Sequence, residues 1–212
     1  MMTFKNRQTA GQELARLIKE KYPKVKDGLV LALPRGGVVV ASEVAQALNL
    51  PLDIIATRKI GAPLNPEYAV AAVSEHKMIT SPRENPDNQY LKEEIQKERR
   101  EIARRLKEYR GGRDKLELKN KTIFLVDDGL ATGLTMAVAI AEVRGQNPAK
   151  IILAVPVAPP ETVERLRSKV DDILVLSIEP MFFAVGQFYE DFPQTTDDEV
   201  KKLLKMMVPT KN

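Results

Sequence analysis

Apolar residues fall into two patterns along the chain, and their alternation predicts the fold. Continuous apolar runs, typical of strands buried on both faces of a sheet, occupy positions 28–33, 123–126, 151–155 and 173–176, and positions 53–56, which start with Asp53, predict a further strand. Between these runs, apolar residues recur at helical spacing, for example from Ala10 to Tyr22 and from Met136 to Val143. Strands that alternate with helices predict an α/β fold with a central parallel sheet flanked by helices.

Two regions do not fit this alternation of strands and helices. Positions 61–66 are rich in Gly and Pro and predict a loop. Positions 68–80 predict a hairpin, and positions 91–109 predict a long charged helix that ends at Gly111, where a C-terminal capping glycine belongs. The length of 212 residues suits one domain, 1–212.

Composition narrows the classes of function. The chain has no Cys, which excludes disulfides, thiolate catalysis and Cys-based zinc sites. No apolar run approaches the roughly 20 residues of a membrane span, and positions 1–26 lack the apolar core of a signal peptide, so we expect a cytoplasmic protein. The net charge of +4 suits a binder of small polyanions. Nucleic acid is not expected, because acids and bases interleave along the charged helix.

The most informative stretch runs from Ile123 to Thr135, IFLVDDGLATGLT. An apolar strand leads into two adjacent carboxylates, Asp127 and Asp128, and then into a loop of small and hydroxyl residues that opens a helix. Backbone N–H groups of such a loop, with the helix N-terminus, suit a phosphate dianion. The two carboxylates suit a vicinal diol or the water shell of Mg²⁺. Together they describe a site for a ribose 5-phosphate.

The alternative for this stretch is an ordinary strand–turn–helix corner in which the carboxylates only cap the turn and the helix. A Walker A phosphate loop does not fit, because Leu134 stands where that motif requires Lys.

Two further segments carry cations at predicted strand ends. Arg35 precedes Gly36 and Gly37 in LPRGG, so a forked phosphate donor adjoins two glycines at a helix start. Arg58 and Lys59 follow the second strand and can bind another face of a polyphosphate. Each segment also has a purely structural interpretation, as a tight turn and as two solvated surface cations.

Other polar and aromatic residues are weaker candidates. His76, the only histidine, stands between two charged residues and is expected to be an exposed loop residue rather than catalytic. Arg113 is a candidate to point towards the strand-end cleft. The segment from 180 to 192 holds four of the six Phe residues and predicts either a packing segment or a hood that stacks on a planar base. Within the hood, the candidates for acceptor binding are Phe183, Gln187 and Tyr189.

Several motifs together resemble the type I phosphoribosyltransferases, specifically the stand-alone members whose acceptor is unassigned. The motifs are LPRGG, RKIGAP with NPE, YRGGR, LVDDG with ATG and T, VPVAPPET and VGQFYEDF. The resemblance implies a flap at about 60–80, whose loop 60–75 closes over the substrate, and a hood at about 178–212. Members of this family often hold the loop after the first strand with a non-proline cis peptide, and the sequence leaves open whether this chain does.

The resemblance implies a function in nucleotide metabolism. A Mg²⁺-dependent enzyme of this family moves the phosphoribosyl group of 5-phosphoribosyl 1-pyrophosphate (PRPP) to a planar, nucleobase-like acceptor and releases pyrophosphate. Asp127 and Asp128 would hold the ribose hydroxyls and contact Mg²⁺ only through water. The implied PRPP loop comprises Asp127, Asp128, Gly129, Leu130, Ala131, Thr132, Gly133 and Thr135.

Pyrophosphate would contact Arg35, Gly36, Gly37, Arg58 and Lys59. The implied catalytic residues are Arg35, Lys59, Asp127 and Asp128. A basic pair such as Arg58-Lys59 reaches a neighbouring subunit in several relatives, which implies a homodimer.

One departure concerns the acceptor. Ala131 stands where enzymes for hypoxanthine and guanine carry an acid that handles a purine proton. This leaves adenine-like, pyrimidine-like and non-nucleobase acceptors open. An acceptor that is already anionic, or a hood carboxylate from Glu190 or Asp191, would replace that base.

Two rival functions come from other classes. A PRPP-binding regulator would use the same loop without turnover, but the cations of LPRGG and of Arg58-Lys59 favour an enzyme. A dinucleotide-binding Rossmann protein would need G-x-G-x-x-G after the first strand, and PRGGVVV lacks that spacing.

Overall fold

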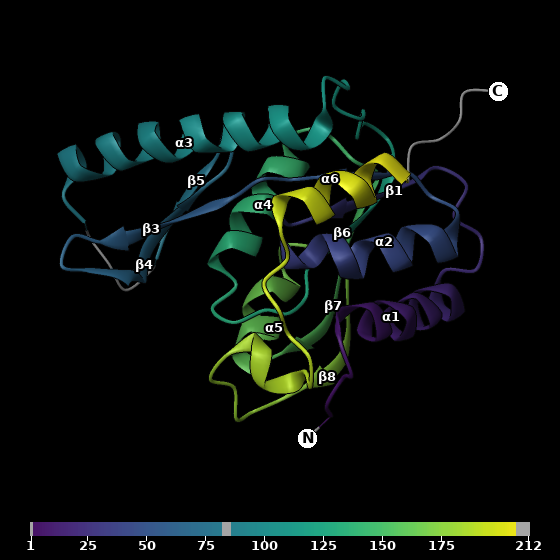
Figure 1. The fold of residues 1–212 in the computed structure, drawn as a ribbon. Coiled ribbons are helices and arrows are strands. Elements are labelled where there is room, and N and C mark those ends of the chain that lie inside the picture. The colour runs from purple at the N-terminus through teal and green to yellow at the C-terminus, as the bar shows by residue number, and fades with distance from the viewer. Residues whose placement is uncertain (1, 82–85, 207–212) are drawn as a thin grey trace.

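A five-stranded parallel sheet forms the centre of the molecule, as the apolar runs predict. The computed structural model describes residues 2–81 and 86–206. The strands follow the spatial order β2-β1-β6-β7-β8 (Figure 1). Their bounds are Gly28–Ala32 for β1, Leu52–Ile54 for β2, Thr122–Val126 for β6, Lys150–Ala158 for β7 and Asp172–Ile178 for β8. Each predicted core strand is therefore present, with its ends shifted by up to three residues.

The chain order of the strands reverses between β1 and β6, which lie side by side. From β1 the chain passes outward to β2 on one side, whereas β6 leads to β7 and β8 on the other. The register pairs Gly28 with Thr122 and Ala32 with Val126, so these two strands end level with each other. In open α/β sheets, ligands bind beyond the carboxyl ends of strands at such a reversal.

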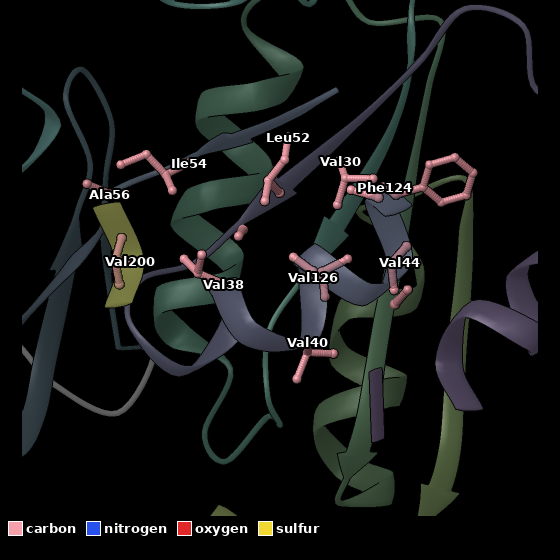
Figure 2. Close-up of a cluster of buried hydrophobic side chains, with 14 of the residues drawn as sticks. Val30, Val38, Val40, Val44, Leu52, Ile54, Ala56, Phe124, Val126 and Val200 are labelled. Atoms are coloured by element: carbon pink, nitrogen blue, oxygen red, sulfur yellow. The ribbon is translucent and has the colours of Figure 1, made fainter. Parts of the chain in front are cut away.

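Helices cover both faces of the sheet, and each face has its own core. Apolar side chains of α1 (Arg7–Lys21) and α2 (Gly36–Leu48) pack on one face with even-numbered β1 and β6 residues such as Val30 and Val126. Figure 2 shows this cluster, which extends to Val200 of α6 (Asp197–Met206). Side chains of α4 (Leu134–Arg144) and α5 (Pro160–Arg167) pack with the odd-numbered residues on the other face. The alternation along each strand thus buries both faces.

The long helix α3 (Asn88–Arg110) lies along a second, smaller sheet (Figure 1). It ends at Gly111 in the left-handed conformation (φ 57°), which confirms the predicted capping glycine. The smaller sheet is antiparallel with the order β3-β4-β5: Arg58–Ala62, Asn65–Val73 and Met78–Thr80. The predicted hairpin at 68–80 is confirmed by β4 and β5.

The prediction that 60–75 forms a loop is wrong, because β3 and β4 occupy most of it. Gly61 suggested a turn, yet it lies at a register irregularity within β3. A Cβ at Gly61 would stand 2.2 Å from the carbonyl oxygen of Pro66, so the glycine permits a close approach of two strands. The residues predicted to form the flap, about 60–80, therefore belong largely to a small sheet that ends at Thr80, and their closure over a substrate stays a prediction.

The segment after β8 contains a 3₁₀ turn, η1 (Val185–Phe188), and then α6. This segment covers the residues predicted to form a hood, 178–212, of which 207–212 lie outside the described range, and it is called the hood below. A small core of Phe4, Ala10, Val157, Phe188 and Tyr189 joins the hood to the N-terminal segment. In the described ranges, no helix combines the length and the apolar character that crossing a membrane requires.

Replacing Asn6 with Ala is expected to lower the free energy of unfolding by about 1 kcal/mol. Asn6 caps α1: its side-chain oxygen accepts from the Thr9 backbone N–H at 2.9 Å. Urea unfolding measures the loss, which corresponds to a fall of about 2–4 °C in Tm. The Asn6→Asp variant, which keeps the capping oxygen, should retain nearly full stability. Equal midpoints for Asn6→Ala and the parent chain would contradict a capping role.

Candidate active site

Two glycine-containing loops meet where β1 and β6 end. The Leu33 N–H donates to the Val126 carbonyl at 3.0 Å, which continues the pairing of the strands to the start of both loops. A Cβ at Gly36 would lie 1.9 Å from Asp128 Oδ2, and one at Gly37 would lie 2.7 Å from Asp127 Oδ1. The structure therefore brings LPRGG and the Asp pair together, and the two glycines are required by the carboxylates beside them.

Arg7, from the start of α1, also contacts this site. Its Nε donates to Asp128 Oδ2 at 2.7 Å, and its Nη1 donates to the Pro193 carbonyl at 2.7 Å. The guanidinium carbon lies 3.6 Å from the ring centre of Phe192. Tyr189 donates its hydroxyl to the Asp128 carbonyl at 2.6 Å. The carboxylate of Asp128 is thus held from α1 and its backbone from the hood.

Burial makes the two carboxylates electrostatically unfavourable when both are charged. It is the largest cause that raises the pKa of Asp127 well above its usual value, and the charge of Asp128 adds to it. The pKa of Asp128 is also raised by burial, although the Arg7 guanidinium opposes the shift. Hydroxyl donors or a hydrated cation at this position would relieve the repulsion. The pair therefore has the chemistry of a receptor for a diol or for Mg²⁺-bound water.

The loop that follows the Asp pair is braced from α5. Thr162 Oγ1 donates to the Ala131 carbonyl at 2.7 Å, and Arg165 Nη2 donates to the carbonyl of Thr132. In a planar trans peptide the N–H points opposite to the preceding C=O. The N–H groups of Thr132 and Gly133 consequently point away from α5, and α4 starts directly after Gly133. Loop N–H groups beside a helix N-terminus suit an anion.

The predicted pyrophosphate residues are arranged less uniformly. Arg35 follows a cis peptide bond from Pro34, so the loop contains the non-proline cis peptide that the sequence left open. The Arg35 side chain extends towards α6, where its Nη1 lies 3.6 Å from Asp197 Oδ1. It is therefore not simply a free phosphate donor in this structure.

The neighbouring basic residues lie on β3. Arg58 Nε donates to Glu98 Oε2 of α3 at 2.6 Å. Successive strand residues point to opposite faces, so exposed Lys59 faces away from α3. The predicted pair is thus divided between two faces of the small sheet, and only Lys59 is directed away from the carboxylate on α3.

The three predicted acceptor residues have different environments. Phe183 is 85% exposed. The Gln187 side chain closes its own turn, because Oε1 accepts from the Phe183 and Ala184 N–H groups and Nε2 donates to the Met181 carbonyl. Tyr189 is buried and its ring stacks on Phe192, with centres 4.8 Å apart. Of the three, only Phe183 presents an open ring.

The hood also borders the predicted PRPP loop. A Cβ at Gly129 would lie 2.7 Å from Val185 Cγ1 in η1, so Gly129 allows the hood turn to pack on the loop. Arg113, the other candidate for this cleft, instead donates to the carbonyls of Arg110 and Leu204. Its guanidinium fastens the end of α3 to α6.

A group with metal-ligating side chains lies elsewhere in the described residues. It comprises Glu75, His76 and Glu142, and includes no predicted site residue. His76 is 65% exposed, as expected, but its Nδ1 lies 2.8 Å from Glu142 Oε1.

Sequence reasoning missed Arg7 because nothing near it marks a site. It is separated from Asp128 by 121 positions and stands at the start of an ordinary amphipathic helix. Thr162 and Arg165 were missed for the same reason, although VPVAPPET, which contains Thr162, contributed to the resemblance.

Comparison with known proteins identifies the family to which this chain is similar. A family model described as the phosphoribosyl transferase domain matches residues 3–193. Two curated relatives from strains of Mycobacterium tuberculosis, both provisionally named phosphoribosyl transferases, are 38% identical over 209 residues. The match covers 96% of this chain and 47% of each relative, so the chain spans about half the length of these relatives.

Solved structures agree with the fold. A crystal structure of a Thermus thermophilus protein is 40% identical, with a TM-score of 0.82 over 97% of this chain and 99% of that one. A structure from Aquifex aeolicus shares the fold at 17% identity, with a TM-score of 0.53 over 82% and 74% of the two chains.

Proposed function

Because the chain belongs to the phosphoribosyl transferase family, we propose that it moves the 5-phosphoribosyl group from PRPP to a nucleobase-like acceptor and releases pyrophosphate. One observation carries the proposal: the half-buried Asp127–Asp128 pair lies between the LPRGG glycines and a loop whose N–H groups point away from α5. A diol receptor and an anion receptor on one loop match the two ends of a ribose 5-phosphate.

In the proposed reaction, the bond from ribose C1 to the pyrophosphate oxygen breaks and a bond from C1 to the acceptor forms. Asp127 and Asp128 hold the ribose hydroxyls, and the loop from Gly129 to Thr135 anchors the 5-phosphate. Binding energy from this remote group positions the reacting carbon. Lys59 and Arg35 balance the negative charge that develops on pyrophosphate.

Mg²⁺ is part of the proposal. The donor set fits it, because Asp127 and Asp128 offer carboxylate oxygens and Arg7 occupies Asp128 Oδ2, which favours contact through water. The ion supplies charge neutralisation on pyrophosphate when it is bound. We also propose a cytoplasmic homodimer with one transferase domain per chain.

The test is pyrophosphate release from PRPP and Mg²⁺, measured against a panel of purine, pyrimidine and non-nucleobase acceptors. The double variant Asp127→Asn/Asp128→Asn is the control. Release that depends on one acceptor and is lost in the control supports the transferase and names its acceptor. Failure of the parent chain to bind PRPP would overturn the proposal.

A regulator that binds PRPP without turnover is the second candidate, and one observation favours it. Arg35 and Arg58 both have carboxylate partners, Asp197 and Glu98, which reduces the positive charge available to a leaving group. Tight PRPP binding without release for any acceptor would favour this candidate.

Replacing Thr162 with Val is expected to raise KM for PRPP about fivefold to tenfold and to change kcat much less. The variant keeps the size of the side chain but removes the hydroxyl that donates to the Ala131 carbonyl and accepts from Arg165. A lost hydrogen bond of about 1–1.5 kcal/mol gives this ratio. Steady-state kinetics with varied PRPP measures it, and Glu164→Gln on the exposed side of α5 is the control. A fall in kcat at unchanged KM would contradict a positioning role for Thr162.

A further inference from the structure

The turn between β4 and β5 contacts α4 near its C-terminal end, whereas the candidate active site adjoins the other end of the same helix. His76 Nδ1 in this turn lies 2.8 Å from Glu142 Oε1, and Glu75 Oε2 lies 4.0 Å from the same nitrogen. One ligand atom from each of the three side chains lies within 4.8 Å of the others. We propose that Glu75, His76 and Glu142 form a binding site for a divalent transition-metal ion, such as Zn²⁺.

Glu142 is the anchor of the proposed site. Its side chain is only 6% exposed, so a charged carboxylate is held where few water molecules reach it. Oε2 accepts from the Ser74 hydroxyl at 2.8 Å and from the His76 N–H at 3.0 Å. These bonds direct the other oxygen, Oε1, to the imidazole. Carboxylate ligands of metals are oriented in this way by donors to their second oxygen.

The distances suit one ion once Glu75 moves closer and the ion replaces the hydrogen bond between His76 and Glu142. Zn²⁺ binds imidazole nitrogen and carboxylate oxygen at about 2.0–2.2 Å, so neighbouring ligand atoms lie about 2.8–3.5 Å apart. His76 and Glu142 already meet this spacing. Glu75 must move closer, and it can, because its side chain is exposed and its present partner, Lys115 Nζ, is 3.7 Å away.

The ligand types select the class of ion. One imidazole with two carboxylates favours Zn²⁺, Mn²⁺ or a similar ion over Mg²⁺ and Ca²⁺, which prefer oxygen ligands alone. The chain has no Cys, so no thiolate competes for the ion. A small cavity lined by Glu75, Lys115, Glu142 and Gln146 adjoins the site.

Such an ion would connect the smaller sheet to the main domain. Glu75 and His76 belong to the turn after β4, whereas Glu142 belongs to α4, which packs on the central sheet. The ion would therefore fix the position of the turn relative to α4. This inference is independent of the proposed transferase activity.

The single histidine permits a selective test. In ¹⁵N-labelled full chain without an affinity tag, every imidazole signal arises from His76. We expect ZnCl₂, added to chelator-treated protein, to shift the Nδ1 signal with a stoichiometry of one and to raise Tm. MgCl₂ should do neither. An imidazole signal that does not respond to Zn²⁺ up to millimolar concentration would overturn the site.

Variants separate the three-ligand site from a lone histidine. Glu142→Gln and Glu75→Gln should each weaken Zn²⁺ binding at least tenfold, whereas Glu164→Gln, at an exposed position of α5, should not. Glu142 is buried, so its replacement could also disturb the fold. The His76→Ala variant, at an exposed position, avoids this difficulty: calorimetry should show that it loses Zn²⁺ binding while it stays folded. Equal Zn²⁺ affinity in parent chain and carboxylate variants would show that His76 binds the ion alone, which contradicts the proposal.

Discussion

The Asp127→Asn variant is expected to lose about 100-fold in phosphoribosyl transfer and, at the same time, to gain stability at neutral pH. The loss follows from weaker hydrogen bonds to the ribose, because a bond to a charged group contributes about 1.5–3 kcal/mol. The gain follows from burial, which raises the pKa of Asp127 and makes its charged form unfavourable in the folded protein. Asparagine has the same shape and its oxygen can still accept from the Asp128 N–H.

The pH dependence gives this prediction a definite sign. A carboxyl whose pKa is raised by folding binds its proton more tightly in the folded chain, so folding is favoured at low pH and loses this contribution as the pH rises above about 4. The Tm difference between Asp127→Asn and the parent chain should therefore be small at pH 4 and grow towards pH 7. Each kcal/mol corresponds to about 2–4 °C.

Asp114→Asn is the matched control, because Asp114 is exposed and lies outside the site. It should change neither Tm nor activity. If Asp127→Asn lowers Tm at pH 7, Asp127 is not an unfavourable charge in the folded protein. If the variant keeps full transferase activity, Asp127 is not a ligand of the ribose.

The Gly36→Ala variant is expected to abolish measurable activity and to lower the free energy of unfolding by about 1–3 kcal/mol, as overpacking does in buried sites. Its Cβ would stand 1.9 Å from Asp128 Oδ2 and 2.7 Å from Arg7 Nε. Relief of this overlap must displace the carboxylate and break its bond to Arg7. Calorimetry measures the loss of PRPP binding that underlies the loss of activity. Urea unfolding measures the loss of stability.

Gly145→Ala is the control for the same chemical change. The nearest atom outside its own stretch of chain would be Lys77 Cε, at 3.4 Å, and its φ of −63° suits any residue. This variant should match or slightly exceed the stability of the parent chain. If Gly36→Ala also retains PRPP binding and stability, the close contact between LPRGG and the Asp pair does not shape the site.

Patterns that repeat along the chain allowed most of the fold to be predicted. The sheet strands were recognisable because they are buried on both faces and are therefore apolar throughout. The end of α3 was recognisable because the positive φ at that position favours a glycine, Gly111. The error at 60–75 has a physical cause: Gly61 and Pro66 look like turn residues, but they mark a close approach within a hairpin. Glycine and proline can therefore mark either a turn or an irregularity within paired strands, and the local sequence alone does not distinguish the two.

The candidate site was predictable only where its residues are consecutive. Asp127, Asp128 and the loop after them form one motif, and the meeting with LPRGG follows from parallel strands that end level. Arg7 and Tyr189 reach Asp128 from sequence separations of 121 and 61. Those contacts depend on tertiary packing and have no periodic or local signal. The aromatic residues of the hood likewise gave no indication which rings are buried.

The contacts of Arg7 also determine when the site can form during synthesis. Arg7 bonds to the carbonyl of Pro193, and the Phe4 N–H bonds to the carbonyl of Phe188. A chain that extends only to the end of β7 contains both strands of the β1–β6 pair, yet it still lacks the groups that hold Arg7 against Phe192. The Asp pair would therefore acquire its full set of partners only after residue 193 has left the ribosome, so the site is completed by residues of the hood.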